Sequence, residues 1–97
     1  MIKRFVKMTF KLERIEEFKR IFNSKKELIA AVKGCSHVEL LQDVDNPCVF
    51  FTYSLWENTG YIEQYRRSEL FKEVWAKTKV LFDDKPEAYS VKEIENE

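Results

Sequence analysis

The stretch Phe50-Phe51-Thr52-Tyr53-Ser54-Leu55-Trp56-Glu57 decides the fold. Aromatic and β-favouring residues dominate it, which predicts a strand over residues 48–56. A helical stripe follows almost at once, and its members are Tyr61, Ile62, Tyr65, Leu70, Phe71, Val74, Trp75, Thr78, Leu81 and Phe82. The strand and the stripe together hold both tryptophans and most of the other aromatic residues. They are therefore the first candidates for the lining of any pocket.

Capping residues divide the helical stripe into two pieces. Asn58 or Thr59 can cap the first piece. Ser68 is typical of a second N-cap, and Glu69 follows it in the first turn, where the helix dipole favours a negative charge. The pattern predicts two helices with a bend near Ser68.

Upstream of this region the sequence predicts a strand and then a helix. In residues 2–10 the apolar side chains Ile2, Val6, Met8 and Phe10 share one parity, which favours a strand. Residues 13–33 follow a helical spacing, carried by Ile15, Phe18, Phe22, Ile29 and Val32. Gly34 is well placed as the left-handed residue that ends the helix.

Two further strands complete the set. Residues 35–42 precede the turn-forming run 43–47, so they are expected to form an antiparallel hairpin with residues 48–56. Alternation along residues 35–42 places Cys35 on the same face as His37. A last strand is predicted over residues 87–94.

The resulting order, β-α-β-β-α-β, is that of an α+β, ferredoxin-like fold with a four-stranded antiparallel sheet. Both crossovers place helices on one face of the sheet. A second copy of the chain is the simplest cover for the other face, so we expect a homodimer.

Composition narrows the class of protein. The 97 residues suit a single domain over 1–97, and 17 basic residues balance 17 acidic ones, interleaved along the chain. This balance argues against nucleic acid and against an anionic membrane as partner. No apolar run approaches the roughly 18 residues of a membrane span, and we expect a cytoplasmic protein with Cys35 and Cys48 as free thiols.

Three segments point to a known family: residues 34–43, which begin Gly34-Cys35, residues 51–57, which end Trp56-Glu57, and residues 68–72, which begin with Ser68. Their order and spacing resemble the antibiotic biosynthesis monooxygenase (ABM) family over almost the whole chain. The resemblance implies a dimeric α/β barrel with a pocket between each sheet and its own helices. It also implies oxidation of quinols or polyketide aromatics by dioxygen without metal or flavin, while one branch of the family degrades haem.

The chain departs from the family at several functional positions. Many members carry a histidine two residues after the serine that opens the last helix, where this chain has Leu70. The haem-degrading branch uses an asparagine, a tryptophan and an axial histidine at positions that hold Lys7, Tyr65 and Trp75 here. The missing histidine argues against haem degradation by that mechanism.

The candidate site residues follow from this chemistry. Cofactor-free oxygenation needs aromatic walls and a group that handles the proton of the substrate hydroxyl. The catalytic candidates are His37, which is the only histidine, Tyr65 and Trp75, and the substrate-binding candidates are Tyr53, Trp56, Tyr61 and Phe71. Each has a simpler interpretation. Aromatics at helical spacing mostly pack in cores. His37 can be a partly exposed strand residue on the face that Cys35, Glu39 and Leu41 share, which would then be the dimer-facing side. One histidine with scattered carboxylates predicts no metal site.

Three functions remain open at this point. The first is a cofactor-independent monooxygenase that acts with dioxygen on a small aromatic or quinol. The alternative is a non-catalytic dimer that binds a small ligand or takes part in a stress response. Haem binding or degradation is the weakest of the three.

Overall fold

A computed structural model describes residues 1–94. Its elements are β1 (Ile2–Thr9), the 3-10 helix η1 (Leu12–Arg14), α1 (Ile15–Ala30), β2 (Cys35–Gln42), β3 (Val49–Trp56), α2 (Thr59–Arg66), α3 (Glu69–Lys79) and β4 (Glu87–Val91). The predicted ferredoxin-like order is confirmed, with two helices in the second crossover. Within the described residues no helix is both long enough and apolar enough for a bilayer span.

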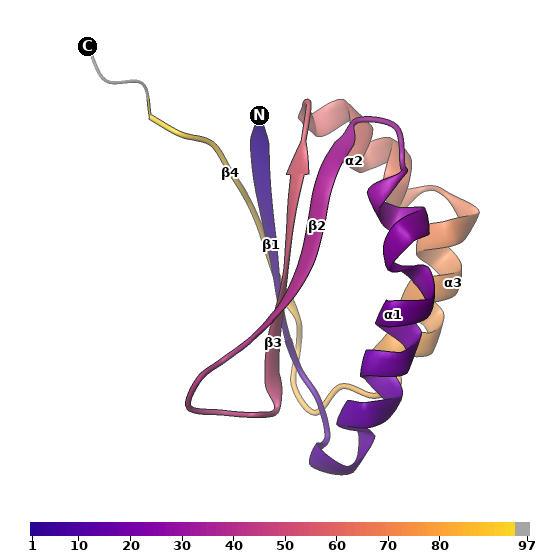
Figure 1. The fold of residues 1–97 in the computed structure, drawn as a ribbon, viewed down its shortest axis with the longest axis vertical. Helices are drawn as coiled ribbons and strands as arrows, with labels where there is room; N and C mark the ends of the chain where they lie inside the picture. The colour runs from indigo at the N-terminus through magenta and orange to yellow at the C-terminus, as the bar shows by residue number, and fades with distance from the viewer. Residues whose placement is uncertain (95–97) are drawn as a thin grey trace.

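The four strands form one antiparallel sheet in the order β2-β3-β1-β4, and the helices cover one of its faces (Figure 1). Side chains alternate between the faces along each strand. On β1 this alternation turns Met8 towards the helices, and Phe10 continues the same side just past the strand. Phe10 stacks on Phe18 of α1, with ring centroids 4.0 Å apart, so the helix-covered face holds the core.

The bend between α2 and α3 is confirmed at Ser68. The Ser68 hydroxyl accepts a hydrogen bond from the backbone N–H of Phe71 at 3.1 Å. The same hydroxyl donates to the carbonyl oxygen of Tyr65 at 2.6 Å. One side chain therefore satisfies both the last turn of α2 and the first turn of α3. The Asn58 side chain caps α2 in the same way, by accepting from the N–H of Tyr61.

Two element ends differ from the sequence prediction by three residues, and the other boundaries differ by two residues or fewer. Helix α1 ends at Ala30 rather than at residue 33. Beyond Ala30 the N–H of Val32 bonds to the carbonyl of Ile29, three residues earlier, so the α-helical pattern of hydrogen bonds gives way to a tighter turn. Gly34 does have a left-handed backbone, with φ of 89°, but it lies in the turn that follows the helix. Strand β4 ends at Val91 rather than at residue 94. Val91 pairs with Lys3, so its partner strand β1 is almost exhausted at that point.

The predicted parity of Cys35 is wrong. Cys35 is the partner of Trp56, and His37 is the partner of Leu55, so the intervening Ser36 forms a bulge. A bulge inserts one residue and reverses the alternation beyond it. Cys35 therefore follows Trp56 onto the helix-covered side, whereas His37 stays on the open face.

Candidate functional site

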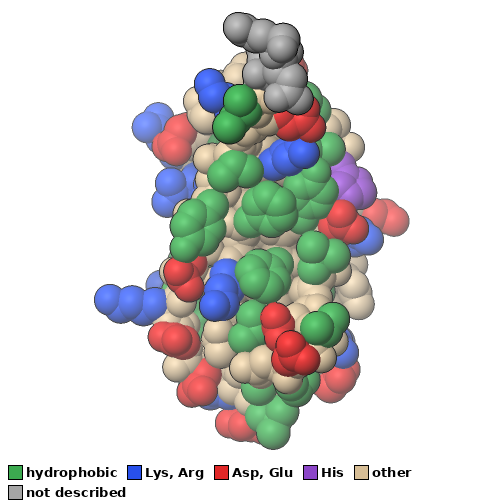
Figure 2. Space-filling view, turned by 90° about the vertical axis from the view of Figure 1, so that its left-hand side faces the viewer, with side chains coloured by type: hydrophobic (Ala, Val, Ile, Leu, Met, Phe, Trp, Pro, Cys, Tyr) green, Lys and Arg blue, Asp and Glu red, His purple; other side chains and the backbone are tan. Residues whose placement is uncertain are grey.

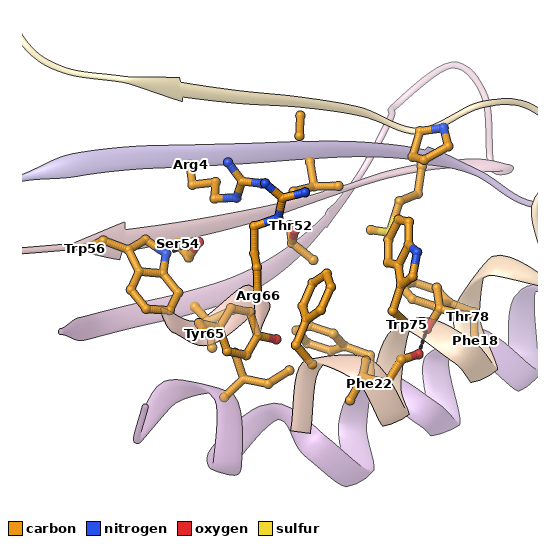
Figure 3. A pocket seen from close by; sticks show the side chains of 18 residues that line it. Arg4, Phe18, Phe22, Thr52, Ser54, Trp56, Tyr65, Arg66, Trp75 and Thr78 are labelled. Atoms are coloured by element: carbon orange, nitrogen blue, oxygen red, sulfur yellow. Dashed lines mark hydrogen bonds between the residues drawn. The ribbon is translucent and has the colours of Figure 1, made fainter. Parts of the chain in front are cut away.

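A cavity of about 340 Å³ lies between the helix-covered face of the sheet and the three helices (Figure 3). All four strands contribute to it, as do α1, α2 and α3. This volume is at the lower end of the range for small-molecule sites. The cavity therefore has room for a small organic ligand.

A row of aromatic side chains forms one wall of the cavity. Trp56 lies against Tyr65, with ring centroids 5.4 Å apart, and Tyr65 meets Phe71 edge to face at 5.2 Å. Phe71 in turn stacks on Trp75 at 5.8 Å, with the ring planes inclined by 12°. These flat, apolar surfaces suit a planar ligand, because offset and edge contacts between rings are favourable.

The far end of the cavity is apolar. Phe18 and Phe22 of α1 lie there (Figure 3), and Met8 of β1 also lines the cavity. Thr78 also lines this end, but its hydroxyl donates to the carbonyl of Val74 at 2.7 Å. The hydroxyl is thus satisfied inside α3. A ligand portion at this end would meet apolar surface.

Trp56 holds the base of the site in place. Its side chain is fully buried, and its indole N–H donates to the Ser54 hydroxyl at 2.9 Å. That hydrogen bond stays within β3, so Trp56 presents ring surface and no free donor to the cavity. The indole ring packs against the ring of Tyr65.

Tyr65 brings a hydroxyl group into the cavity (Figure 3). Its pKa is raised to about 12, chiefly by burial and then by the neighbouring Cys35, while Arg4 acts in the opposite direction. Burial likewise raises the pKa of the Cys35 thiol. At neutral pH both groups are protonated, so Tyr65 can donate a hydrogen bond but cannot act as a base.

Two arginines lie over the same end of the cavity as Tyr65 (Figure 3). Arg4 comes from β1, is half-buried and donates to the Ser90 hydroxyl of β4 at 2.9 Å. Arg66 comes from α2, and its nearest carboxylate is that of Glu63, 3.6 Å away. Burial, followed by the positive charge of Arg66, lowers the pKa of Arg4. The cavity thus has a cationic end and an apolar end.

Four of the seven candidate residues line the cavity: Trp56, Tyr65, Phe71 and Trp75. Tyr61 lies outside it, with its ring against Gly34 and the Lys33 ammonium 5.8 Å from the ring centroid.

His37 and Tyr53 lie on the open face of the sheet, because they alternate with cavity-lining positions along β2 and β3. The Tyr53 ring stacks on Phe5, with centroids 5.0 Å apart. His37 places its Nε2 atom 3.4 Å from a carboxylate oxygen of Glu39. The sheet therefore separates both side chains from the cavity.

Sequence reasoning missed the polar residues of the cavity: Arg4, Thr52, Ser54 and Arg66. Arg4 carried a usable signal, since it shares its parity with Val6 and Met8 on a strand whose other face holds Lys3 and Lys7. A charge among inward-facing apolar residues is unusual and points to a function. Arg66 carried none, because a basic residue in the last turn of a helix is common.

Residues that could hold a metal ion are not grouped anywhere in residues 1–94: no three His, Cys, Asp or Glu side chains are suitably placed. Carboxylate and imidazole groups are also missing from the cavity lining within this part of the chain.

The family model for antibiotic biosynthesis monooxygenases matches residues 1–77. The chain belongs to the ABM family. The match covers β1 through most of α3, and therefore includes nearly all of the cavity. A search of the curated proteins found no match.

Solved structures agree with the ABM assignment. A conserved protein from Methanosarcina mazei Go1 has a TM-score of 0.91 at 25% identity, covering 96% of this chain and 92% of that one. An antibiotic biosynthesis monooxygenase has a TM-score of 0.91 at 15% identity over 98% and 100% of the two chains. A Nitrosomonas europaea protein assigned to the same family reaches 0.89 at 15% identity over the same shares. The last two likenesses bear on the fold alone.

Proposed function

We propose that this ABM protein is a monooxygenase that oxidises a small phenol or quinol with dioxygen and uses no added cofactor. The observation that carries the proposal is the cavity itself. Its aromatic wall suits a planar substrate, and its cationic end suits the anion that such a substrate forms. Membership of the ABM family supports the same reaction class.

The polar end of the cavity acts by stabilising an anion. Because the lining within residues 1–94 supplies no carboxylate or imidazole base, the substrate hydroxyl loses its proton to water. Tyr65 donates a hydrogen bond to the resulting oxyanion, and the positive charge of Arg4 favours the same state. Charge stabilisation in a partly dry site lowers the pKa of the bound hydroxyl.

The reaction balances without an external reductant. The phenolate has carbanion character at a ring carbon. That carbon adds to dioxygen and forms a C–O bond, and the resulting peroxide takes up a proton to give a hydroperoxide. Loss of the ring proton from that carbon and cleavage of the O–O bond then yield a quinone carbonyl and water. One oxygen atom of dioxygen enters the product, and the substrate supplies all the electrons. Trp75 and Phe71 shield this step from solvent.

The open face of the sheet supports a homodimer. Apolar side chains gather over the middle of this face, and charged side chains lie between and around them (Figure 2). Its apolar members are Phe5, Leu41, Phe51, Tyr53, Leu55, Tyr89 and Val91. Tyr89, Leu41 and Val91 are between 41% and 53% exposed. A continuous patch of exposed apolar side chains is unusual on a monomeric protein and is typical of an interaction surface. We propose that a second copy of the chain packs on this face and completes a barrel.

Oxygen consumption tests the proposed reaction. Reduced quinols and polyphenols would be supplied to the wild type and to Tyr65→Phe, Trp75→Phe and His37→Ala, with chelator present. We expect catalysed uptake that falls in Tyr65→Phe and Trp75→Phe but persists in His37→Ala, because the sheet separates His37 from the cavity. A loss confined to His37→Ala would move the chemistry to the open face.

One observation favours a second function, ligand binding without turnover. The cavity lining lacks a base within the described residues, and Tyr65 remains protonated at neutral pH. Uptake no faster than the uncatalysed oxidation, combined with tight binding of the same compounds, would establish a binding protein. The family resemblance covers both functions.

A further inference from the structure

We propose that the ligand of this cavity is an aromatic carboxylic acid whose carboxylate is held by Arg4 and Arg66. The inference rests on the proposed use of the cavity as the substrate site. It adds a second recognition element, a carboxylate, which lies beside the reacting hydroxyl at the cationic end of the cavity.

The site has two positive charges at one end. Arg4 and Arg66 approach the same end of the cavity from opposite layers, one from β1 and one from α2 (Figure 3). Two positive groups held close together repel each other, and an anion between them offsets that repulsion by attracting both. Both residues belong to regular elements, so the backbone fixes where their side chains start. The fold therefore keeps this pair together.

The two arginines have few charge partners within the described residues. Arg4 bonds to the neutral hydroxyl of Ser90. The Glu63 carboxylate also acts on Arg4 and raises its pKa, but burial and the charge of Arg66 lower that pKa more strongly. Arg66 approaches Glu63 only to 3.6 Å, and both side chains are more than half exposed, so water screens that contact. The cavity lining within residues 1–94 includes no acidic residue. One exposed carboxylate, Glu63, therefore faces two guanidinium groups, and an anionic ligand would supply the second negative charge.

A carboxylate is the anion that suits the two arginines best. A carboxylate has one charge and two oxygens in a plane, which matches the donors of a guanidinium group. A phosphate monoester has nearly two charges and is more strongly hydrated, so two arginines that remain partly open to solvent would compensate it less well. We therefore assign a carboxylate.

The carboxylate and the reacting hydroxyl of the ligand bind at the same end of the cavity. The ring of the ligand lies along the aromatic wall, with its apolar edge towards Phe18 and Phe22. Tyr65 feels the charge of Arg4, so the donor for the reacting hydroxyl adjoins the carboxylate site. The hydroxyl and the carboxylate are then neighbours on the ring, as in an ortho-hydroxy aromatic acid.

A pair of matched ligands tests the assignment. 1-Hydroxy-2-naphthoate and its neutral amide, 1-hydroxy-2-naphthamide, have the same ring, the same hydroxyl and nearly the same shape. Binding of each would be measured by titration calorimetry without turnover, to the wild type, to Arg66→Gln and to Arg67→Gln. Arg67 is the matched control, because it is exposed, adjacent in sequence and outside the cavity lining.

We expect the wild type to bind the naphthoate about tenfold more tightly than the amide. Arg66→Gln should lose most of that preference by weakening the naphthoate alone, and Arg67→Gln should retain it. Equal affinities for the two ligands, equal effects of the two substitutions, or no binding of either ligand at millimolar concentration would each overturn the inference.

The outcomes also separate this inference from the proposed reaction. A carboxylate preference that depends on Arg66, found in a protein that consumes no oxygen, would support the ligand class and refute the oxygenase. Catalysed oxidation of neutral quinols without any preference for the naphthoate would do the reverse.

Discussion

The ring of Tyr61 lies directly against Gly34, at the point where α2 crosses the turn before β2. A Cβ atom on residue 34 would overlap the Cβ, Cγ and Cδ2 atoms of Tyr61. Gly34 also has a positive φ, and its carbonyl accepts a hydrogen bond from the N–H of Glu57 at 2.8 Å. The absence of a side chain at Gly34 therefore lets α2 pack closely against the turn before β2.

Gly34→Ala should destabilise the fold by more than about 1 kcal/mol, because it combines a strained backbone with an overlap against a ring. Urea unfolding followed by tryptophan fluorescence measures the change. Gly60→Ala is the matched control, since Gly60 has no positive φ and its nearest neighbour is only the Asn58 side chain at 3.1 Å. A Gly34→Ala midpoint equal to that of the wild type would refute this account of the turn.

Ser68→Ala should cost about 1 kcal/mol of unfolding free energy, because the joint between α2 and α3 loses its cap. Ser24→Ala is the control with the same chemical change. The Ser24 hydroxyl only bonds back to the carbonyl of Ile21 on the exposed side of α1, so alanine there should be neutral or slightly stabilising. Chemical unfolding of both variants checks the prediction, and similar losses at the two positions would contradict it.

The raised pKa of Tyr65 predicts a specific alkaline sensitivity. Tyrosine ionises near pH 10 in the unfolded chain, whereas Tyr65 in the folded protein ionises at about 12. The unfolded state therefore loses this proton first, and the folded state is progressively destabilised as the pH rises from about 10 to 12. Tyr65→Phe should remove that loss, which is about 1.4 kcal/mol at pH 11, midway between the two pKa values. Unfolding free energies measured for both proteins at pH 8 and at about pH 11 give the comparison.

The open face of the sheet predicts the state of association. Phe5 lies at the centre of this face, opposite Tyr53 on β3 and Tyr89 on β4. Phe5→Glu would bury a charge in the proposed interface, so it should convert a dimer into monomers. Leu28→Glu is the control, because Leu28 is 55% exposed on α1, away from the sheet. Sedimentation velocity distinguishes the two, and a wild type that sediments as a monomer would refute the barrel.

The sequence carried most of the fold because its local signals agreed with one another. Alternation in residues 2–10, the helical stripes and the caps at Asn58 and Ser68 all led to the observed order of elements. The exception is the bulge at Ser36. No residue type in that segment demands an extra residue, since the bulge comes from the pairing of β2 with β3 and not from local preference.

The site was harder to predict than the fold. The aromatic wall could be recognised, since Tyr65, Phe71 and Trp75 lie on one helical stripe. A strand residue can line the cavity only if it lies on the helix-covered face of the sheet. His37 and Tyr53 lie on the open face, so they do not reach the cavity. The juxtaposition of Arg4 with Arg66 joins two residues from opposite layers, and a single sequence has no pattern that reports such a contact.

Isotopically labelled dioxygen gives the most direct test of the central claim. A phenol or quinol substrate would be incubated with the wild type and with Trp75→Ala under labelled dioxygen, and the product would be analysed by mass spectrometry. The account predicts one labelled oxygen atom in each product molecule, formed much more slowly by the variant. A product without label, or label that enters at the same rate without the protein, would contradict it.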